Sequence, residues 1–424
     1  MTVKNREIKW FGPLLTDGRD YYPFFVHESR GEVLEFMGRW DEAITIYDKV
    51  ANRAESADDP ASLAQVRNKL GWLLHKRGDE SRALELLTMA GEHYRTGNDA
   101  KNLSMVTNKI GNIHNRLGEY AKAKECFKEA LELAESCHDR SGISVALNNL
   151  GNAYGDVGEN EMALECYQKC YQMDMAAGDH LNAGLDMGNM GWIYLVMGEY
   201  DRAMACWEKQ KTSSTLMGDK HSLSIALGNM AVVHMMRGDY QKGMEGIQSR
   251  LKIAGEMGDK KGLSISYSHL ANVHASNHEL DKAVEAYEKA IGLAREIGLK
   301  YYLTIFLQEA GEVYWEDGQM AKAEESCRES LDLAESINKK DTIFKCRLLQ
   351  ARINAHRDKG AGIEQIQRLL EETEQPGQKA VLHYQLFKYT KDDWHRRRAL
   401  ELYSELNEKS PNIDYKRKME ELEG

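Results

Sequence analysis

Carboxamide side chains recur every 40 residues along this 424-residue chain, and they are its best candidates for ligand binding. The first and third of the three positions involved lie four residues apart and therefore share one face of a helix. Because asparagine both donates and accepts hydrogen bonds, a column of asparagines can hold the backbone of an extended peptide. We call these positions the polar ladder: Asn68-Lys69-Trp72, Asn108-Lys109-Asn112, Asn148-Asn149-Asn152, Gly188-Asn189-Trp192, Gly228-Asn229-Val232, Ser268-His269-Asn272 and Gln308-Glu309-Glu312.

The polar ladder has two interpretations. Its side chains either face a bound peptide, or they bond to neighbouring segments and cap turns. One polar face shared by seven repeats favours the binding interpretation, and the second interpretation stays open.

Motifs of catalysis are missing from the sequence. It contains no Gly-x-x-x-x-Gly-Lys-Ser/Thr loop, no His-Glu-x-x-His and no Gly-x-Ser-x-Gly elbow. His274 and His278 lie four residues apart, but no third metal ligand accompanies them. We therefore expect no enzymatic activity, no cofactor and no metal site.

Other histidines and cysteines follow the same period of 40 residues. His114, His234 and His274 take the position that tyrosines hold elsewhere, which predicts packing residues with local hydrogen-bond partners. Cysteines in successive repeats are too far apart for a disulfide. We predict buried thiols at Cys126, Cys166, Cys170 and Cys206.

Three columns of small residues share this period and predict the elements that position the ladder. A small residue within a helix permits close helix packing, and a glycine seven residues later supplies the positive φ of a helix end. Each repeat is thus predicted as helix A, a tight turn and helix B. The columns are Gly31, Gly71, Gly111, Gly151, Gly191, Ala231, Ala271, Gly311 and Ala351; Gly38, Gly78, Gly118, Gly158, Gly198, Gly238 and Gly318, with His278 breaking the set; and Ala43, Ala83, Ala123, Ala163, Ala203, Gly243, Ala283 and Ala323.

The pattern resembles the tetratricopeptide repeat (TPR) family, as in Leu150-Gly151-Asn152-Ala153-Tyr154, Gly158-Glu159, Ala163 and Tyr167. The resemblance covers about residues 24–410. The 40-residue unit is similar to those of Pins-like adaptors, kinesin light chains and TPR arms of bacterial signalling proteins. It implies an all-α fold, a right-handed α-solenoid of about ten helical hairpins, in which helix A lines a concave surface that binds proteins or peptides.

The two ends depart from the repeat. We predict an aromatic-rich leader or cap over residues 1–23, eight 40-residue repeats over 24–340, and degenerate repeats with a C-terminal cap over 341–424. The leader could also have packed on an upstream domain.

The composition of the chain limits the classes of partner that we expect it to bind. A net charge of −11 argues against general nucleic-acid binding. No apolar run is long enough to span a bilayer, and the start of the chain lacks a signal-peptide core. Seven cysteines without disulfide-rich spacing fit a reducing cytoplasm.

Charges on helix A predict the direction of a bound peptide. The early repeats carry Lys69 and Lys109, and the eighth carries Glu312 and Glu316. We therefore expect an extended peptide with an acidic end near the lysines and basic residues near the glutamates. The predicted peptide-binding residues are Asn68, Lys69, Trp72, Asn108, Lys109, Asn112, Arg116, Asn148, Asn149, Asn152, Asn189, Trp192, Asn229, Asn272, Glu312 and Glu316.

Three functions are compatible with this pattern. The first is a scaffold that binds a protein or peptide in the concave groove. The second is a regulatory or sensor arm of a larger bacterial signalling protein, such as a cyclase or an ATPase. The third is a receptor for a signalling peptide, although the effector module expected of such receptors is missing from the sequence.

Overall fold

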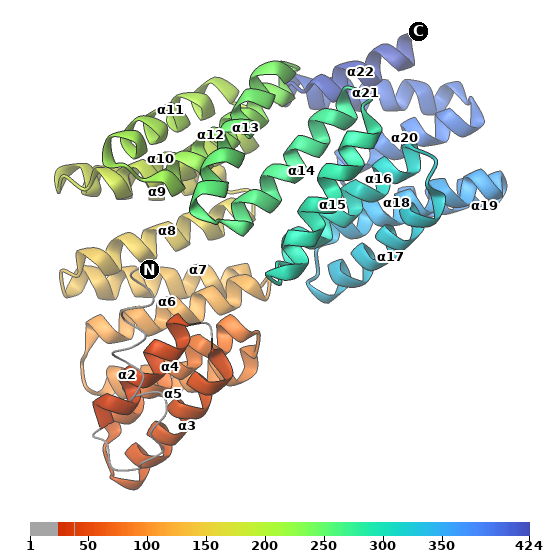
Figure 1. Ribbon diagram of the computed structural model, residues 1–424. Helices are drawn as coiled ribbons and strands as arrows, with labels where there is room; N and C mark the ends of the chain where they lie inside the picture. Colours follow the sequence, from red (N-terminus) through yellow and green to blue (C-terminus); the bar gives the residue numbers. More distant parts are fainter. Residues whose placement is uncertain (1–23, 38) are drawn as a thin grey trace. The chain divides into compact units, whose positions relative to one another are not determined.

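The computed structural model describes residues 24–37 and 39–424, and every regular element in these residues is an α-helix. Ten consecutive helical hairpins are followed by one last helix, which confirms the predicted all-α solenoid (Figure 1). Even-numbered helices from α2 to α20 are helix A of a hairpin, and odd-numbered ones are helix B. The helices are α2 (Phe24–Phe36), α3 (Trp40–Ser56), α4 (Pro60–Arg77), α5 (Glu80–Thr96), α6 (Ala100–Arg116), α7 (Tyr120–Ser136), α8 (Arg140–Asp156), α9 (Asn160–Ala176), α10 (His180–Val196), α11 (Tyr200–Met217), α12 (Lys220–Met236), α13 (Tyr240–Met257), α14 (Lys260–Ser276), α15 (Leu280–Glu296), α16 (Lys300–Glu316), α17 (Met320–Ser336), α18 (Lys340–Arg357), α19 (Lys359–Glu372), α20 (Pro376–Thr390), α21 (Asp393–Lys409) and α22 (Ile413–Glu423).

The turn between helix A and helix B is left-handed, as the turn-glycine column predicts. Gly78 has a φ of 92° and Gly158 a φ of 82°, values that cost glycine little because it has no Cβ. His278, which breaks the column in sequence, adopts the same conformation with a φ of 61°. The turn geometry therefore persists where the glycine is lost. Gly38 lies outside the described residues.

Aspartates begin many of the helices. The Asp59 carboxylate accepts a hydrogen bond from the backbone N–H of Ser62 at 3.1 Å, and Asp99 does the same for Asn102 at 3.1 Å. These bonds satisfy donors that a helix start leaves unpaired. Glu119 holds the same place before α7 but makes no side-chain cap, because its carboxylate contacts His114 instead.

The small-residue column marks where helix A meets a large side chain of helix B. A Cβ added at Gly151 would lie 2.8 Å from the ring of Tyr167, and one at Gly191 would lie 2.6 Å from the indole nitrogen of Trp207. Tyr167 and Trp207 are both buried. The glycine thus makes room for an aromatic ring in the core of the hairpin.

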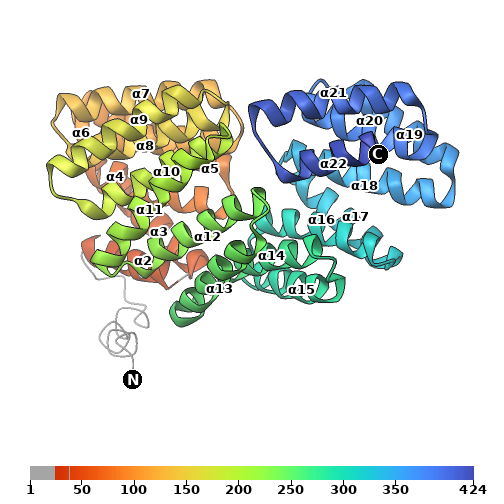
Figure 2. The same cartoon turned by 90° about the horizontal axis from the view of Figure 1, so that it is seen from above.

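The chain divides into two compact units, residues 1–173 and 174–424, and the boundary falls within α9. Within each unit consecutive hairpins stack in chain order (Figures 1 and 2). The predicted division into leader, eight repeats and degenerate end stays a prediction, and its leader lies outside the described residues. Among the described residues, every helix is too short or too polar to cross a bilayer.

The C-terminal part of the second unit loses the glycine turn, as its sequence indicates. Asp358 alone joins α18 to α19, with an extended backbone, and its carboxylate accepts hydrogen bonds from the N–H groups of Gly360 and Ala361. The end of the chain then returns to the earlier repeats of the same unit. Tyr200 and Ser410 place their hydroxyl oxygens 3.4 Å apart.

A single substitution at the helix crossing tests this packing. Gly191→Leu should lower the free energy of unfolding by about 1–3 kcal/mol, because the new side chain must displace the ring of Trp207. The measurement is chemical denaturation followed by circular dichroism. Gly255→Leu is the matched control, since a Cβ there meets no atom within 4 Å. Equal losses in both variants would contradict the close approach at Gly191.

Candidate functional site

Polar-ladder side chains bond from one hairpin to the next. The Asn149 amide donates to the side-chain oxygen of Asn108 at 3.1 Å, and the Lys109 ammonium donates to that of Asn68 at 2.7 Å. In both pairs the partners lie 41 residues apart, so the second position of one helix A contacts the first position of the preceding helix A. The same offset joins the Ser268 hydroxyl to Glu309 at 3.0 Å.

The third ladder position bonds within its own hairpin. The Tyr167 hydroxyl donates to the side-chain oxygen of Asn152 at 2.7 Å, and Tyr287 donates likewise to Asn272. Asn112 turns its amide to the backbone oxygen of Asn108 at 3.1 Å. Thus several of the predicted peptide-binding groups also stabilise the stack, which is the second of the two interpretations. The two roles are compatible, because a side-chain amide can make up to four hydrogen bonds.

A pocket of about 560 Å³ in the first unit gathers three predicted residues, Asn68, Lys69 and Lys109. Burial lowers the pKa of Lys109 to about 8, and the nearby charges of Lys69 and Lys76 act in the same direction, while Glu35 opposes them. The Lys109 ammonium lies 5.6 Å from the ring centre of Trp72. The ladder therefore presents a cation above an aromatic ring at the edge of a pocket.

Acidic residues of the preceding helices neutralise much of the positive charge that helix A carries in the early repeats. Lys69 pairs with Glu32 at 2.5 Å, Lys76 pairs with Glu35 at 2.6 Å, and Arg116 pairs with Glu80. Sequence inspection missed these partners because they lie in other helices. Only the three-dimensional stacking brings them to the lysines.

In the second unit, Glu312 pairs with Arg352 at 2.5 Å, and Glu316 is exposed. Burial raises the pKa of Glu309, which accepts hydrogen bonds from Ser268 and Tyr287. The charge gradient along helix A stays a prediction. Two of its four charges, Lys69 and Glu312, are also engaged in ion pairs between helices.

An apolar stripe on α10 is a further feature that the ladder did not reveal. Trp192, a predicted site residue, is 55% exposed, and Leu181, Leu185 and Val196 are exposed as well. Their spacing places all four on one face of the helix. Exposed apolar residues that cluster in this way are typical of interaction surfaces. Asn189 and Asn229, the carboxamides of α10 and α12, are partly buried.

The periodic histidines have local partners, as predicted. His114 contacts Glu119 at 2.6 Å, and His274 contacts Glu279 at 2.6 Å. Within the described part of the chain, no group of three or more His, Cys, Asp or Glu side chains could hold a metal ion. Cys166, Cys170 and Cys206 are buried, whereas Cys126 is only partly so.

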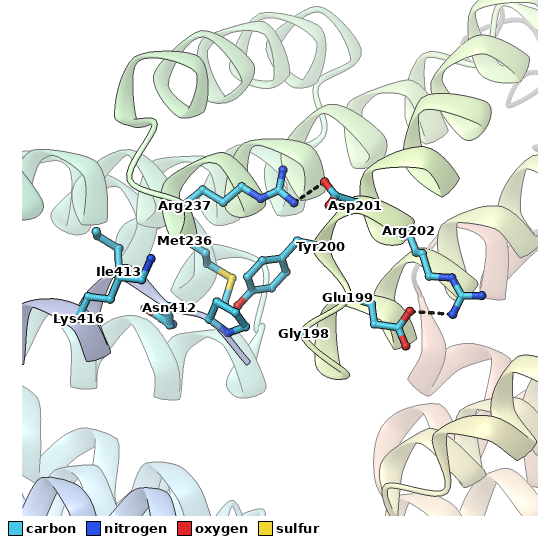
Figure 3. Close-up of a pocket in the computed structure, with 11 residues that line it drawn as sticks. Gly198, Glu199, Tyr200, Asp201, Arg202, Met236, Arg237, Asn412, Ile413 and Lys416 are labelled. Atoms are coloured by element: carbon cyan, nitrogen blue, oxygen red, sulfur yellow. Dashed lines mark hydrogen bonds and ion pairs between the residues drawn. The ribbon is translucent and has the colours of Figure 1, made fainter. Parts of the chain in front are cut away.

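A second pocket, of about 500 Å³, lies in the second unit where the chain end meets earlier repeats. Its walls come from the turn before α11 and the first residues of that helix, from the end of α12, and from residues 411–413 and Lys416. Figure 3 shows the Asp201–Arg237 and Glu199–Arg202 ion pairs on one side and Ile413 and Lys416 on the other. This pocket cannot be predicted from the sequence, because the segments that form its walls lie about two hundred residues apart along the chain and do not share the 40-residue period.

Comparison with protein families identifies the repeat. The profile described as tetratricopeptide repeat matches residues 25–96, 102–176 and 142–209, and that of the MalT-like TPR region matches residues 210–392. The chain belongs to the tetratricopeptide repeat family. No relative among curated protein sequences matches this TPR protein.

Solved structures share the TPR fold at low sequence identity. Aspartyl phosphate phosphatase F from Bacillus subtilis is 15% identical, with a TM-score of 0.54, over 77% of this chain and 87% of that one. A Rap protein solved in complex with competence and sporulation factor is 12% identical, with a TM-score of 0.51, over 74% and 98%. IFIT1, solved with m7Gppp-AAAA, is 12% identical, with a TM-score of 0.52, over 95% and 91%. These likenesses concern the fold.

The low pKa of Lys109 predicts a dependence of stability on pH. Below about pH 8 the amine is charged in the folded and unfolded states alike, and the folded state bears the full cost of burial. Between about 8 and 10.5 the folded state loses its proton first, so the unfolded state binds more protons and stability rises with pH. In urea denaturation, Lys109→Met should remove this rise. Parallel pH profiles for both proteins would contradict it.

Proposed function

We propose that this TPR protein is a non-enzymatic scaffold that binds an extended segment of a partner protein along the helix-A face, in the cytoplasm. The observation that carries the proposal is the pocket at Asn68, Lys69 and Lys109, which places two cations and a carboxamide around one open space. In the second unit, the exposed stripe at Trp192 offers an apolar contact area of its own on α10. Mixed polar and apolar positions of this kind suit a peptide, which offers backbone groups and side chains in alternation.

The lysines select the chemistry of the peptide at this pocket. Lys109 is partly buried and its charge is disfavoured there, so an anionic group of the partner would stabilise its protonated form. We therefore propose an acidic residue or a free carboxyl terminus beside Lys69 and Lys109. Basic residues of the partner would lie beside Glu312 and Glu316.

Two alternatives share this binding mode and differ in its biological setting. The match of residues 210–392 to the MalT-like TPR region supports a sensor arm of a larger signalling protein. The Rap structure solved with a peptide factor supports a receptor for a signalling peptide. IFIT1 carries a capped RNA on a similar fold. We favour a peptide over RNA because the net charge here is −11.

Selection from a displayed library of random dodecapeptides tests the binding function. The full chain should enrich a peptide family, and Lys69→Glu combined with Lys109→Gln should weaken its binding. The loss should be largest at low salt, because it removes an attraction between charges. Titration by fluorescence anisotropy at two salt concentrations measures it.

Exposed lysines of helix B supply the control. Lys128→Glu with Lys169→Gln changes the charge on α7 and α9 by the same amount, away from the pocket. This variant should bind as the parent does. Failure of the parent chain to enrich any peptide would refute the proposed function, and equal binding by both variants would refute the pocket as its site.

A further inference from the structure

In two repeats of the second unit, the ladder position of helix A is a glycine, and the large residue at this crossing belongs to helix B instead. In the first unit Asn148 of α8 contacts Cys170 of α9, a residue 22 positions later, at 3.4 Å. At the same offset, α10 and α12 carry glycines, and their helix-B partners are large. A Cβ at Gly188 would lie 2.8 Å from the amide of Gln210, and one at Gly228 would lie 2.7 Å from Cδ of Arg250. The helix-B side chains thus extend across the glycines into the space that a ladder residue would occupy.

Among the described residues, the side chain of Arg250 has no partner in this space. Its side chain is 7% exposed, and its Nε is enclosed with no hydrogen-bond partner. In the described residues its guanidinium makes no hydrogen bond and no ion pair within the usual distances. The opposing charge that acts most strongly on it, that of Asp259, already caps α14 by accepting from the N–H of Gly262 at 2.9 Å. A buried cation left this way costs stability until an anion meets it.

Two other polar side chains at the interruption of the ladder are also incompletely paired. Gln210 is 2% exposed, and its side-chain oxygen has no partner. His269 follows Gly228 by 41 residues, the offset at which ladder residues bond, and its Nδ1 is enclosed without a partner. Burial lowers the pKa of His269 to about 3, and the charge of Arg250 adds to this, so the imidazole stays neutral. The cation of Arg250 and the neutral imidazole of His269 therefore lie near each other where the ladder is interrupted, and Gln210 takes the corresponding place one repeat earlier.

We propose that Arg250, with His269 near it, is a subsite for one carboxylate of the bound peptide. This inference rests on the proposed function, since the carboxylate reaches Arg250 from the helix-A face. Arginine can bind a carboxylate through two parallel hydrogen bonds, which fixes the position of the peptide as well as its charge. A single guanidinium matches one negative charge. Tyr302 and Asp259, the other ionisable groups near it, bring no second cation that a phosphate dianion would need.

The test repeats the selection of random dodecapeptides, displayed with free carboxyl termini, on the full chain and on Arg250→Met. Methionine keeps the linear shape of the side chain and removes its charge. The parent should enrich one fixed acidic position, or the carboxyl terminus itself, that the variant no longer prefers. Synthetic peptides then identify the source: replacement by Asn or Gln, or by a terminal amide, should weaken binding to the parent about 30-fold or more and leave the variant unaffected.

Arg295→Met is the matched control, because Arg295 is an exposed arginine of α15 that pairs with Glu329 at 2.5 Å. It should keep the acid preference. Removal of an unpaired buried charge should also raise the thermal midpoint of the free chain in Arg250→Met. Enriched peptides with the same acid preference in parent and variant would overturn the subsite alone. A lower midpoint with that preference intact would make Arg250 a structural residue, and no enrichment at all would overturn the binding function together with the subsite.

Discussion

The approach of helix A to a large side chain of helix B governs this structure. At Gly151 and Gly191 the helix backbone lies against an aromatic ring, with no room for a side chain of its own. This contact fixes how closely the two helices of a hairpin approach and how helix A is rotated about its own axis. Rotation in turn decides which residues of helix A point toward the next hairpin. The ladder bonds between Asn68 and Lys109 and between Asn108 and Asn149 are geometric consequences of that packing.

The periodic part of this arrangement is readable from sequence because each contact recurs every 40 residues. Ten hairpins, the left-handed turns and the local partners of His114 and His274 follow from columns of residue types. Even His278 keeps the turn, since the flanking helices demand it. The pairing of Lys69 with Glu32 was not foreseen, because the glutamate lies outside the three columns. The return of Ser410 to Tyr200 depends on the curvature of a whole unit, which no local pattern records.

The ladder residues serve packing and can serve binding at once, with a different balance in the two units. In the first unit Asn68 and Asn108 already accept hydrogen bonds from the next helix A, so a peptide there would share groups that the fold uses. Such groups are held in place by their partners, which reduces the entropy lost when a peptide binds. In the proposed function, the fold would thus hold these positions ready for a ligand. It also limits how many of their hydrogen bonds remain for one.

At Gly188 and Gly228 the ladder is interrupted, and there the balance between packing and binding is reversed. An asparagine in these places would be expected to bond to the following helix A, as Asn108 does. Gln210 and Arg250 fill the same space from helix B and leave polar atoms without partners. Packing alone does not explain this choice, because methionine would fill the volume without burying a charge. A charge that destabilises the free chain and is neutralised by a ligand converts that cost into selectivity, since only a partner with the matching anion removes it. If the proposed subsite binds a carboxylate, the departure from the repeat, rather than the repeat itself, is where the structure would distinguish one ligand from another.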